Sequence, residues 1–328
     1  MVQKLVIEGL SHAATATAAE FCHTATTTPQ SPRRRRHGPG AARKDGHVRR
    51  GLAPASGSWT GRAGCSRCTQ PRCICGTNHR KKAHTMKFAV IGGTGLIGSR
   101  VVENLNAAGH QAVPHSLSTG VDIITGQGLE AAVAGADVII NLTNSPTFDD
   151  ASLAFFQTSM DNLLAASDKA GVGHFVILSI VGVDQVPNLD YYRAKVVQEG
   201  ILKAGPIPYS IVRATQFMEF MDATLSMTTD GDTVRLPRTP IQPIAAADVS
   251  SVVAEVAAGR PLNGIVNIAG PDVYHLDELG RLTLTANNDG RCVITDDTAG
   301  MFAVVHGDVL TAPNDARIAP THYTDWLC

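Results

Sequence analysis

The sequence predicts an α/β fold in which helices cover both faces of a parallel sheet, the arrangement called doubly wound. From residue 86 onward, short apolar segments alternate with longer helical segments, and this alternation is typical of βα units. The apolar segments are continuous rather than alternating with polar residues, which indicates strands that are buried on both faces. A glycine-rich turn after the first of these segments supports the same fold.

The first apolar segment, Lys87 to Ile91, is followed by this turn and by a helix predicted over residues 99–108. A diphosphate can approach a helix N-terminus only where the preceding backbone lacks side chains, because free N–H groups and the positive end of the helix dipole must face it. Glycine tolerates the positive φ of a tight turn, and Gly98 would let the helix pack closely on the strand. The turn is therefore predicted to bind a dinucleotide through Gly92, Thr94, Gly95, Leu96, Ile97 and Gly98.

The second strand is predicted over residues 111–116. A cofactor without a 2′-phosphate usually meets an Asp or Glu near the end of this strand, but this chain has His115 and Ser116 there. This difference favours NADP, with NAD as the alternative. A third strand is expected at Val121–Ile123, and it would place the carboxylate of Asp122 where it could accept a hydrogen bond from the adenine amine.

The rest of the chain continues the alternation. Further strands are predicted at residues 137–142, 174–179 and 209–213, and helices at residues 149–170 and 190–204. Leu142 and Thr143, at the end of one strand, are predicted to line the cofactor. Ser179 closes the next strand at its carboxyl end, where open α/β sheets bind their ligands.

Tyr191 and Lys195 are four residues apart near a helix start, so their side chains lie on one face of the helix. A free phenol has a pKa of about 10, which is too high for efficient proton exchange near neutrality. An ammonium about 4 Å away, at an effective dielectric of about 20, contributes about 4 kcal/mol, so Lys195 is expected to lower the pKa of Tyr191 to about 7. Ser179 could hydrogen-bond the same substrate oxygen. Ser179, Tyr191 and Lys195 are thus the predicted catalytic residues.

Six segments carry a family resemblance: Gly92–Gly98, His174–Ser179, Tyr191–Lys195, Tyr209–Glu219, Pro243–Val249 and Asn267–Pro271. They resemble the NmrA-like branch of the atypical short-chain dehydrogenases/reductases. The resemblance covers residues 86–328 and implies a Rossmann domain with a small C-terminal substrate-covering part at about 214–328. It also implies that Lys195 holds the nicotinamide ribose and that Gln216 and Phe217 line the substrate side. The family's catalytic asparagine has no clear counterpart, since Asn162 lies a turn or more too late on its helix.

The function expected from these residues is reduction of a carbonyl or quinone-like small molecule by an NADP-preferring oxidoreductase. The nicotinamide would supply the hydride and Tyr191 the proton. A noncatalytic dinucleotide-binding redox sensor is the main alternative, because the resembling branch includes such members. A nucleotide-sugar epimerase shares the glycine turn and the Tyr/Lys pair, although the short C-terminal part leaves limited room for a sugar nucleotide.

Charge and cysteine content divide the chain near residue 85. Residues 1–85 carry 15 Lys and Arg against three Asp and Glu, whereas residues 86–328 carry 13 against 26. The first part has little apolar periodicity and is predicted to be a disordered basic extension, whose charge would give only nonspecific affinity for nucleic acid. Its clustered cysteines are more closely spaced than in zinc modules, so no metal is expected. The two distant cysteines of the second part favour the reducing cytoplasm, and no apolar run is long enough to span a membrane.

Overall fold

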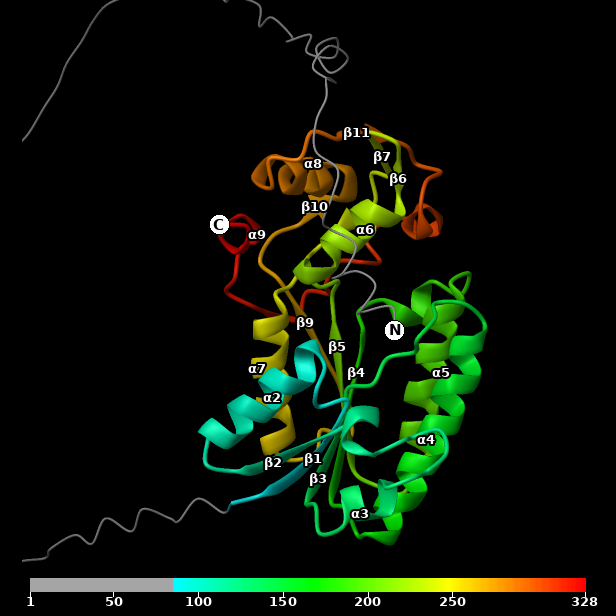
Figure 1. Ribbon diagram of the computed structural model, residues 1–328, viewed down its shortest axis with the longest axis vertical. Coiled ribbons are helices and arrows are strands. Elements are labelled where there is room, and N and C mark those ends of the chain that lie inside the picture. Colours follow the sequence, from blue (N-terminus) through cyan, green and yellow to red (C-terminus); the bar gives the residue numbers. More distant parts are fainter. Residues whose placement is uncertain (1–84) are drawn as a thin grey trace, which may run out of the picture. The chain divides into compact units, whose positions relative to one another are not determined.

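The computed structural model describes residues 85–328, which form a seven-stranded sheet with helices on both faces (Figure 1). In spatial order the strands are β12 (Arg317–Ile318), β9 (Gly264–Ala269), β5 (Tyr209–Ala214), β4 (His174–Ile180), β3 (Val138–Asn141), β1 (Lys87–Ile91) and β2 (Gln111–His115). Every neighbouring pair is parallel. The predicted doubly wound α/β fold is confirmed, whereas the predictions for the basic extension fall on residues 1–84, outside the described residues.

The helices divide between the two faces of this sheet. One face is covered by α2 (Leu96–Ala107) and α7 (Ala246–Ala258), and the other by α3 (Leu129–Val133), α4 (Ala151–Lys169) and α5 (Asp190–Ala204) (Figure 1). The predicted helix over residues 190–204 matches α5 in both bounds. Because the first helix lies on one face and the next ones on the other, the sheet has a switch point between β1 and β3, where ligands bind in such folds.

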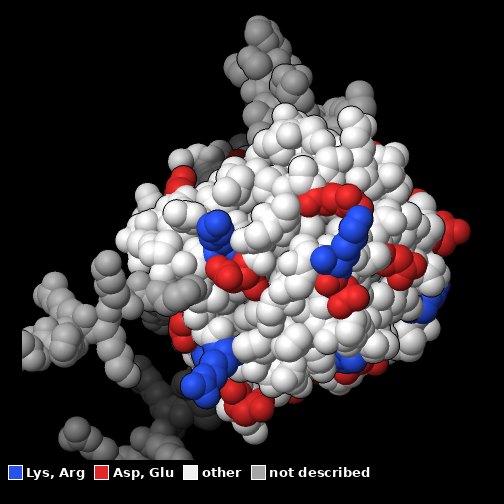
Figure 2. Space-filling model, turned by 90° about the horizontal axis from the view of Figure 1, so that it is seen from below, with Lys and Arg blue, Asp and Glu red and all other residues white. Residues whose placement is uncertain are grey.

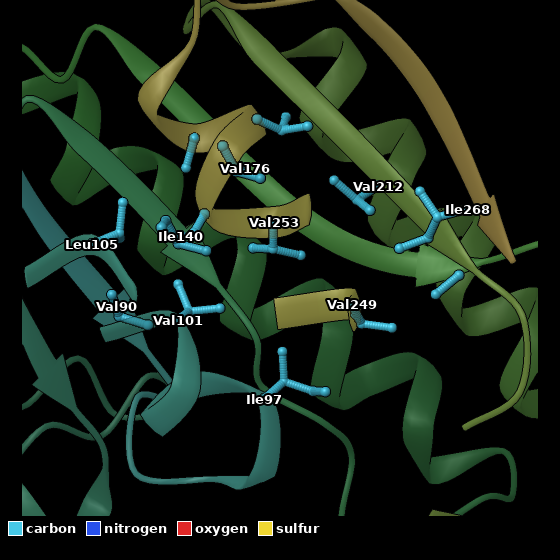
Figure 3. Packing of buried hydrophobic residues seen from close by; sticks show 14 of the residues in the cluster. Val90, Ile97, Val101, Leu105, Ile140, Val176, Val212, Val249, Val253 and Ile268 are labelled. Carbon is cyan, nitrogen blue, oxygen red and sulfur yellow. The ribbon is translucent and has the colours of Figure 1, made fainter. Parts of the chain in front are cut away.

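The strands are apolar throughout because they are packed from both sides. Toward α2 and α7, Val90, Ile140, Val176 and Val212 form one core with Val253 (Figure 3). Toward α4, neighbouring strand residues form a second core with helix residues; its members include Ile139, Phe175, Ile177, Met160 and Leu163. Full burial of one such side chain stabilises the fold by about 1.5–3 kcal/mol, so the core on each face of the sheet contributes strongly to stability.

The expected third strand at Val121–Ile123 is wrong. This segment is a turn, in which Asp122 Oδ1 accepts hydrogen bonds from the backbone N–H groups of Ile124 at 2.8 Å and Thr125 at 3.3 Å. An aspartate that bonds to its own following backbone offers the chain an alternative to a strand ladder. As a result β3 pairs directly with β1, and the strand that contains Ser179 is the fourth of the sheet, not the fifth.

A second, smaller group of elements lies among the residues after β5. It contains α6 (Met221–Met227), α8 (Leu276–Ala286), α9 (Tyr323–Trp326), a three-stranded sheet of β6 (Thr229–Asp230), β7 (Thr233–Leu236) and β11 (Cys292–Thr295), and the pair β8 (Pro240–Ile241) and β10 (Tyr274–His275). These elements share their own apolar core, which includes Leu225, Leu236, Leu279 and Tyr323. Since α7 and β9 return to the main sheet, the chain after residue 214 contributes to both groups.

Short 3₁₀ turns join several of these elements: η2 (Leu117–Thr119), η3 (Val183–Gln185), η4 (Met218–Phe220) and η5 (Met301–Val304).

Figure 2 shows one face of the molecule, where acidic and basic side chains lie beside one another rather than in separate patches. Among residues 85–328, no helix is both long and apolar enough to cross a membrane.

Candidate active site

The glycine-rich turn leaves the N-terminus of α2 open. The residue before the helix, Gly95, has an extended conformation with φ −82° and ψ −179°, and no side chain caps the helix. The first helical hydrogen bond runs from the Ser99 N–H to the Gly95 carbonyl at 3.0 Å. The N–H groups of Leu96 and Ile97 therefore precede the helical ladder and lie at the positive end of the helix dipole.

Backbone surrounds this turn so closely that side chains would not fit. A Cβ added to Gly98 would lie 2.2 Å from the Gly92 carbonyl oxygen, so the close approach at Gly98 is to the turn rather than to the strand that was expected. Gly92 has φ +79°, and its added Cβ would lie 2.9 Å from the carbonyl carbon of Leu142. Gly93, which was absent from the predicted site, is needed because a Cβ there would lie 2.6 Å from the Pro114 Cα.

The turn fits the diphosphate of a dinucleotide. The first turn of α2 contains no acidic residue, and the glycines leave the backbone N–H groups without covering side chains, as anion binding requires. Thr94 is exposed at the surface of the turn. These residues could hold the phosphates of NAD(P) through backbone N–H groups alone.

The other predicted cofactor residues follow the carboxyl ends of neighbouring strands. Ile91 is paired with His115 of β2 and with Asn141 of β3, so His115, Ser116, Leu142 and Thr143 cluster around the turn. The His115 carbonyl accepts from the Gly92 N–H at 2.8 Å, and burial lowers the pKa of the His115 imidazole. The Thr143 hydroxyl donates to Asn141 Oδ1 at 2.7 Å. The carboxylate of Asp122, by contrast, is used within its own turn, where the backbone N–H of Ile124 lowers its pKa.

Tyr191 lies in the first turn of α5 among aromatic side chains. Its hydroxyl donates a hydrogen bond to Asn144 Oδ1, and its ring centroid lies 5.0 Å from that of Phe148 and 5.9 Å from that of Phe156. Burial raises the pKa of Tyr191, and the neighbouring Tyr192 adds to this effect. The expectation that a nearby ammonium brings the pKa of Tyr191 to neutrality is therefore wrong for this arrangement.

Lys195 does lie one turn further along the same helix, but its ammonium has other partners. Lys195 Nζ donates to the Leu178 carbonyl at 2.7 Å and to Gln198 Oε1, and it sits 4.8 Å from the ring centroid of Phe156. Burial lowers the pKa of Lys195 to about 7, against an opposing effect of Glu199. An amine with this pKa exchanges protons readily near neutrality.

The hydroxyl of Ser179 is bound to a buried carboxylate. It donates to Glu199 Oε1 at 2.7 Å, and the same carboxylate accepts from Arg213 at 2.8 Å and from Lys203 at 2.9 Å. Desolvation opposes the charge of Glu199, but the hydrogen bonds from Arg213, Ser179 and Lys203 together lower its pKa. With its proton directed to Glu199, Ser179 has lone pairs rather than a free donor to offer a ligand.

Gln216 and Phe217 follow the carboxyl end of β5. Gln216 Nε2 donates to the Tyr192 hydroxyl at 3.3 Å, while Gln216 Oε1 is buried and has no hydrogen-bond partner among the described residues. Phe217 stacks on Phe220 at 5.4 Å. An unpaired buried oxygen costs about 1–3 kcal/mol, so a ligand or a water that donates to Gln216 would be favoured here.

Several residues that contact the predicted catalytic side chains were missed by the sequence analysis: all but Gln198 come from a distant segment, and Gln198 lies three residues after Lys195 on the same helix, a spacing that could have indicated the contact. They are Asn144, Phe156, Gln198 and Glu199. Asn162 donates hydrogen bonds to the carbonyls of Ile123 and Ile124, both at 2.9 Å. Among residues 85–328 it makes no hydrogen bond to Lys195. Phe156 is the residue of α4 that faces the Lys195 ammonium.

A bare helix N-terminus at the first βα turn of a doubly wound sheet defines a dinucleotide-binding protein. A family model described as NAD(P)H-binding matches residues 92–259, and the chain belongs to this family. This membership agrees with the expected NAD(P)-binding family and indicates an NAD(P) cofactor, without distinguishing NADP from NAD.

Comparison with individual proteins gives more distant relatives. The photosystem II assembly factor Ycf39 of Synechocystis is 28% identical over 151 residues, which are 41% of this chain and 46% of that protein. The chain thus matches about half the length of this curated relative. A nucleoside-diphosphate-sugar epimerase from Staphylococcus aureus shares the fold with a TM-score of 0.54 and 14% identity, over 74% of this chain and 99% of the epimerase. An NADPH-dependent quinone oxidoreductase from Escherichia coli, solved with NADPH, has a TM-score of 0.50 and 19% identity, over 64% and 77% of the two chains.

Proposed function

We propose that this protein is an NAD(P)H-dependent oxidoreductase, with a preference for NADP, that reduces a carbonyl or quinone-like small molecule. The observation that carries the proposal is the open N-terminus of α2 at the same edge of the sheet as Tyr191 and Lys195. Membership of the NAD(P)H-binding family and the fold shared with a quinone oxidoreductase support it.

The chain's own residues suit hydride transfer to an oxygen-bearing substrate. When bound, the reduced nicotinamide supplies the hydride. The Tyr191 hydroxyl now donates to Asn144, and a substrate oxygen that took the place of this acceptor would receive the proton. Lys195, whose pKa burial lowers to about 7, can hold the ribose with its ammonium and return a proton near neutral pH.

The preference for NADP rests on the end of β2. His115 and Ser116 stand where an acidic residue would repel a 2′-phosphate, and the Ser116 and Ser118 hydroxyls lie 2.8 Å apart. A Ser116→Asp variant places a carboxylate there, so we expect it to weaken NADPH more than NADH. Titration of both reduced cofactors by fluorescence tests this; equal weakening of the two, or NADH binding more tightly to the unaltered chain, contradicts the preference.

The catalytic step is tested by following oxidation of NADPH by the full chain with a panel of quinones and aldehydes. Tyr191→Phe removes the proposed proton donor, so turnover is expected to fall at least about 100-fold with little change in NADPH affinity. Tyr209→Phe, at the amino end of β5, removes a phenol far from the site and serves as the matched control. Tyr192→Phe shows whether the adjacent phenol acts instead.

Two observations favour a noncatalytic dinucleotide sensor as a second candidate. Ser179 gives its proton to Glu199, and burial raises the pKa of Tyr191, so neither group is poised as a strong donor in this state. Tight NADPH binding without oxidation by any panel member, together with equal behaviour of the Tyr191→Phe variant, would support the sensor over the enzyme.

A further inference from the structure

The side chain of Asn144 is the hydrogen-bond partner of the Tyr191 hydroxyl. Asn144 lies in the loop between β3 and α4, 47 residues before Tyr191 in the sequence, and its amide oxygen accepts the phenol proton. Asn144 is exposed, and its amide takes part in no other hydrogen bond found among residues 85–328. The amide is therefore free to rotate about its Cβ–Cγ bond without breaking another interaction.

An amide can serve a phenol in both of its protonation states. Its oxygen accepts from the neutral hydroxyl, and its NH₂ group donates to the oxygen after the proton has left. Hydrogen bonds to an ionised group are roughly twice as strong as those between neutral groups. This assistance matters at Tyr191, because its side chain is buried beside the rings of Phe148 and Phe156 and burial disfavours the phenolate.

Building on the proposed function, we infer that Asn144 is a positioning residue for proton transfer: it holds the neutral Tyr191 hydroxyl and, after rotation of its amide, stabilises the phenolate left by donation to substrate. When the substrate oxygen replaces the amide oxygen as acceptor of the Tyr191 proton, the amide rotates and its NH₂ group donates to Tyr191 Oη, so the two side chains stay in contact. The proton moves from Tyr191 Oη to the substrate oxygen as hydride reaches the substrate carbon, so charge is balanced within the step.

Other charges near Tyr191 do not replace this interaction. Titratable groups on α5 are Asp190, Tyr192, Arg193, Lys195, Glu199 and Lys203, and those on neighbouring segments are Asp149, Asp150, Asp184, His306 and Asp308. Asp190 and Arg193 are paired with each other. Of these, Tyr192 acts on the charge of Tyr191, and it raises the pKa. Lys195 is directed to the Leu178 carbonyl and Gln198.

Two variants separate the accepting and donating roles of Asn144. Asn144→Asp keeps an acceptor of nearly the same shape but removes the donor, and Asn144→Leu removes both. We expect each to lower kcat for NADPH-dependent reduction of a naphthoquinone at least about tenfold at neutral pH, and to move the pH profile of kcat, with NADPH affinity within about threefold of the unaltered chain. Asn104→Asp, on the exposed face of α2, adds the same charge away from Tyr191 and controls for it.

A second measurement keeps the inference independent of turnover. The chain has five tyrosines, so NMR of protein labelled at tyrosine Cζ gives few signals, and the signal lost in Tyr191→Phe identifies Tyr191. Asn144→Leu and Asn144→Asp are expected to shift this signal, whereas Asn104→Asp leaves it in place. An unshifted Tyr191 signal in Asn144→Leu, or an unchanged kcat and pH profile in an active enzyme, overturns the role of Asn144. Absence of all turnover with a shifted signal overturns the proposed oxidoreductase instead.

Discussion

A carboxylate placed at Gly95 tests where the cofactor diphosphate lies. Gly95 precedes α2 with φ −82° and ψ −179°, a conformation that any residue adopts, so Gly95→Asp requires no strained backbone. The atom nearest to an added Cβ is the Gly92 carbonyl oxygen at 3.3 Å, which is a tight but not prohibitive approach. The aspartate side chain would then accept from the free N–H groups of the first helical turn.

Gly95→Asp is expected to affect the stability of the fold and the affinity for the cofactor in opposite directions. Aspartate caps a helix better than glycine by a few tenths of a kcal/mol, so the free energy of unfolding should change by less than about 1 kcal/mol. Its charge, about 4 Å from a phosphate at an effective dielectric of about 20, repels each phosphate charge by about 4 kcal/mol, which corresponds to about a thousandfold weaker binding.

Isothermal titration with NADPH and thermal unfolding measure the two quantities on the same samples. Gly95→Asn is the matched control, because asparagine has the same shape and also caps helices but carries no charge. We expect Gly95→Asp to lose far more affinity than Gly95→Asn while both unfold close to the temperature of the unaltered chain. If Gly95→Asp binds NADPH within about threefold of the unaltered chain, the diphosphate does not lie at the N-terminus of α2.

Three further changes test other parts of the structure. Gly270→Ala should lower the free energy of unfolding by about 3 kcal/mol or more in urea titration, because its Cβ would lie 1.8 Å from the Pro243 carbonyl oxygen, while Gly264→Ala, with its nearest atom at 3.6 Å, should not. Burial lowers the pKa of His174 from 6.5 to about 4, so only the unfolded chain gains a proton between these values; stability should fall as pH drops through this range, and less so in His174→Gln. Phe148→Ala, which removes a ring that is 54% exposed beside the proposed proton donor, should raise KM for a naphthoquinone by about threefold to tenfold but not for a small aliphatic aldehyde. Equal losses for both glycines, an unchanged pH slope, or equal effects on both substrates would contradict the respective reasoning.

The strands of the main sheet could be predicted because burial on both faces leaves a plain mark in the sequence. Runs such as Phe175–Leu178 have no polar residue to face water, and the helices between them end at glycines such as Gly171 and Gly205. The segment Val121–Ile123 has a similar apolar content, yet it contains an aspartate that bonds its own following backbone. Apolar composition alone does not reveal this local competition, which explains the missing strand.

Those parts of the site that one short segment forms could be predicted from the sequence. Those parts that depend on contacts between distant segments could not. Gly98 packs against Gly92 and Gly93 of the same turn, and the positive φ of Gly92 also belongs to that turn, so the need for these two glycines can be predicted from neighbouring residues. The approach of the Leu142 backbone to Gly92 comes from a distant segment and cannot. The shared helix face of Tyr191 and Lys195 also follows from spacing, but their partners do not. Lys195 finds the carbonyl of Leu178, 17 residues earlier in the chain, and such a contact depends on how α5 lies on the sheet.

The placement of α5 depends in turn on the carboxylate that takes the Ser179 proton. Tyr191, Lys195 and Glu199 follow one another at four-residue intervals, so they share one helix face at a rise of about 6 Å per step. Glu199 joins this helix to β4 through Ser179 and to β5 through Arg213. Removing one partner of a buried ion pair costs about 3–5 kcal/mol, because the other charge is left unpaired. A shift of α5 along the sheet would break these bonds, and the same bonds therefore set the height of the phenol and the amine above the strand ends. In this arrangement Ser179 helps to fix the helix that carries Tyr191 through its bond to Glu199, and under the proposed function the phenol is the group that donates to the substrate oxygen.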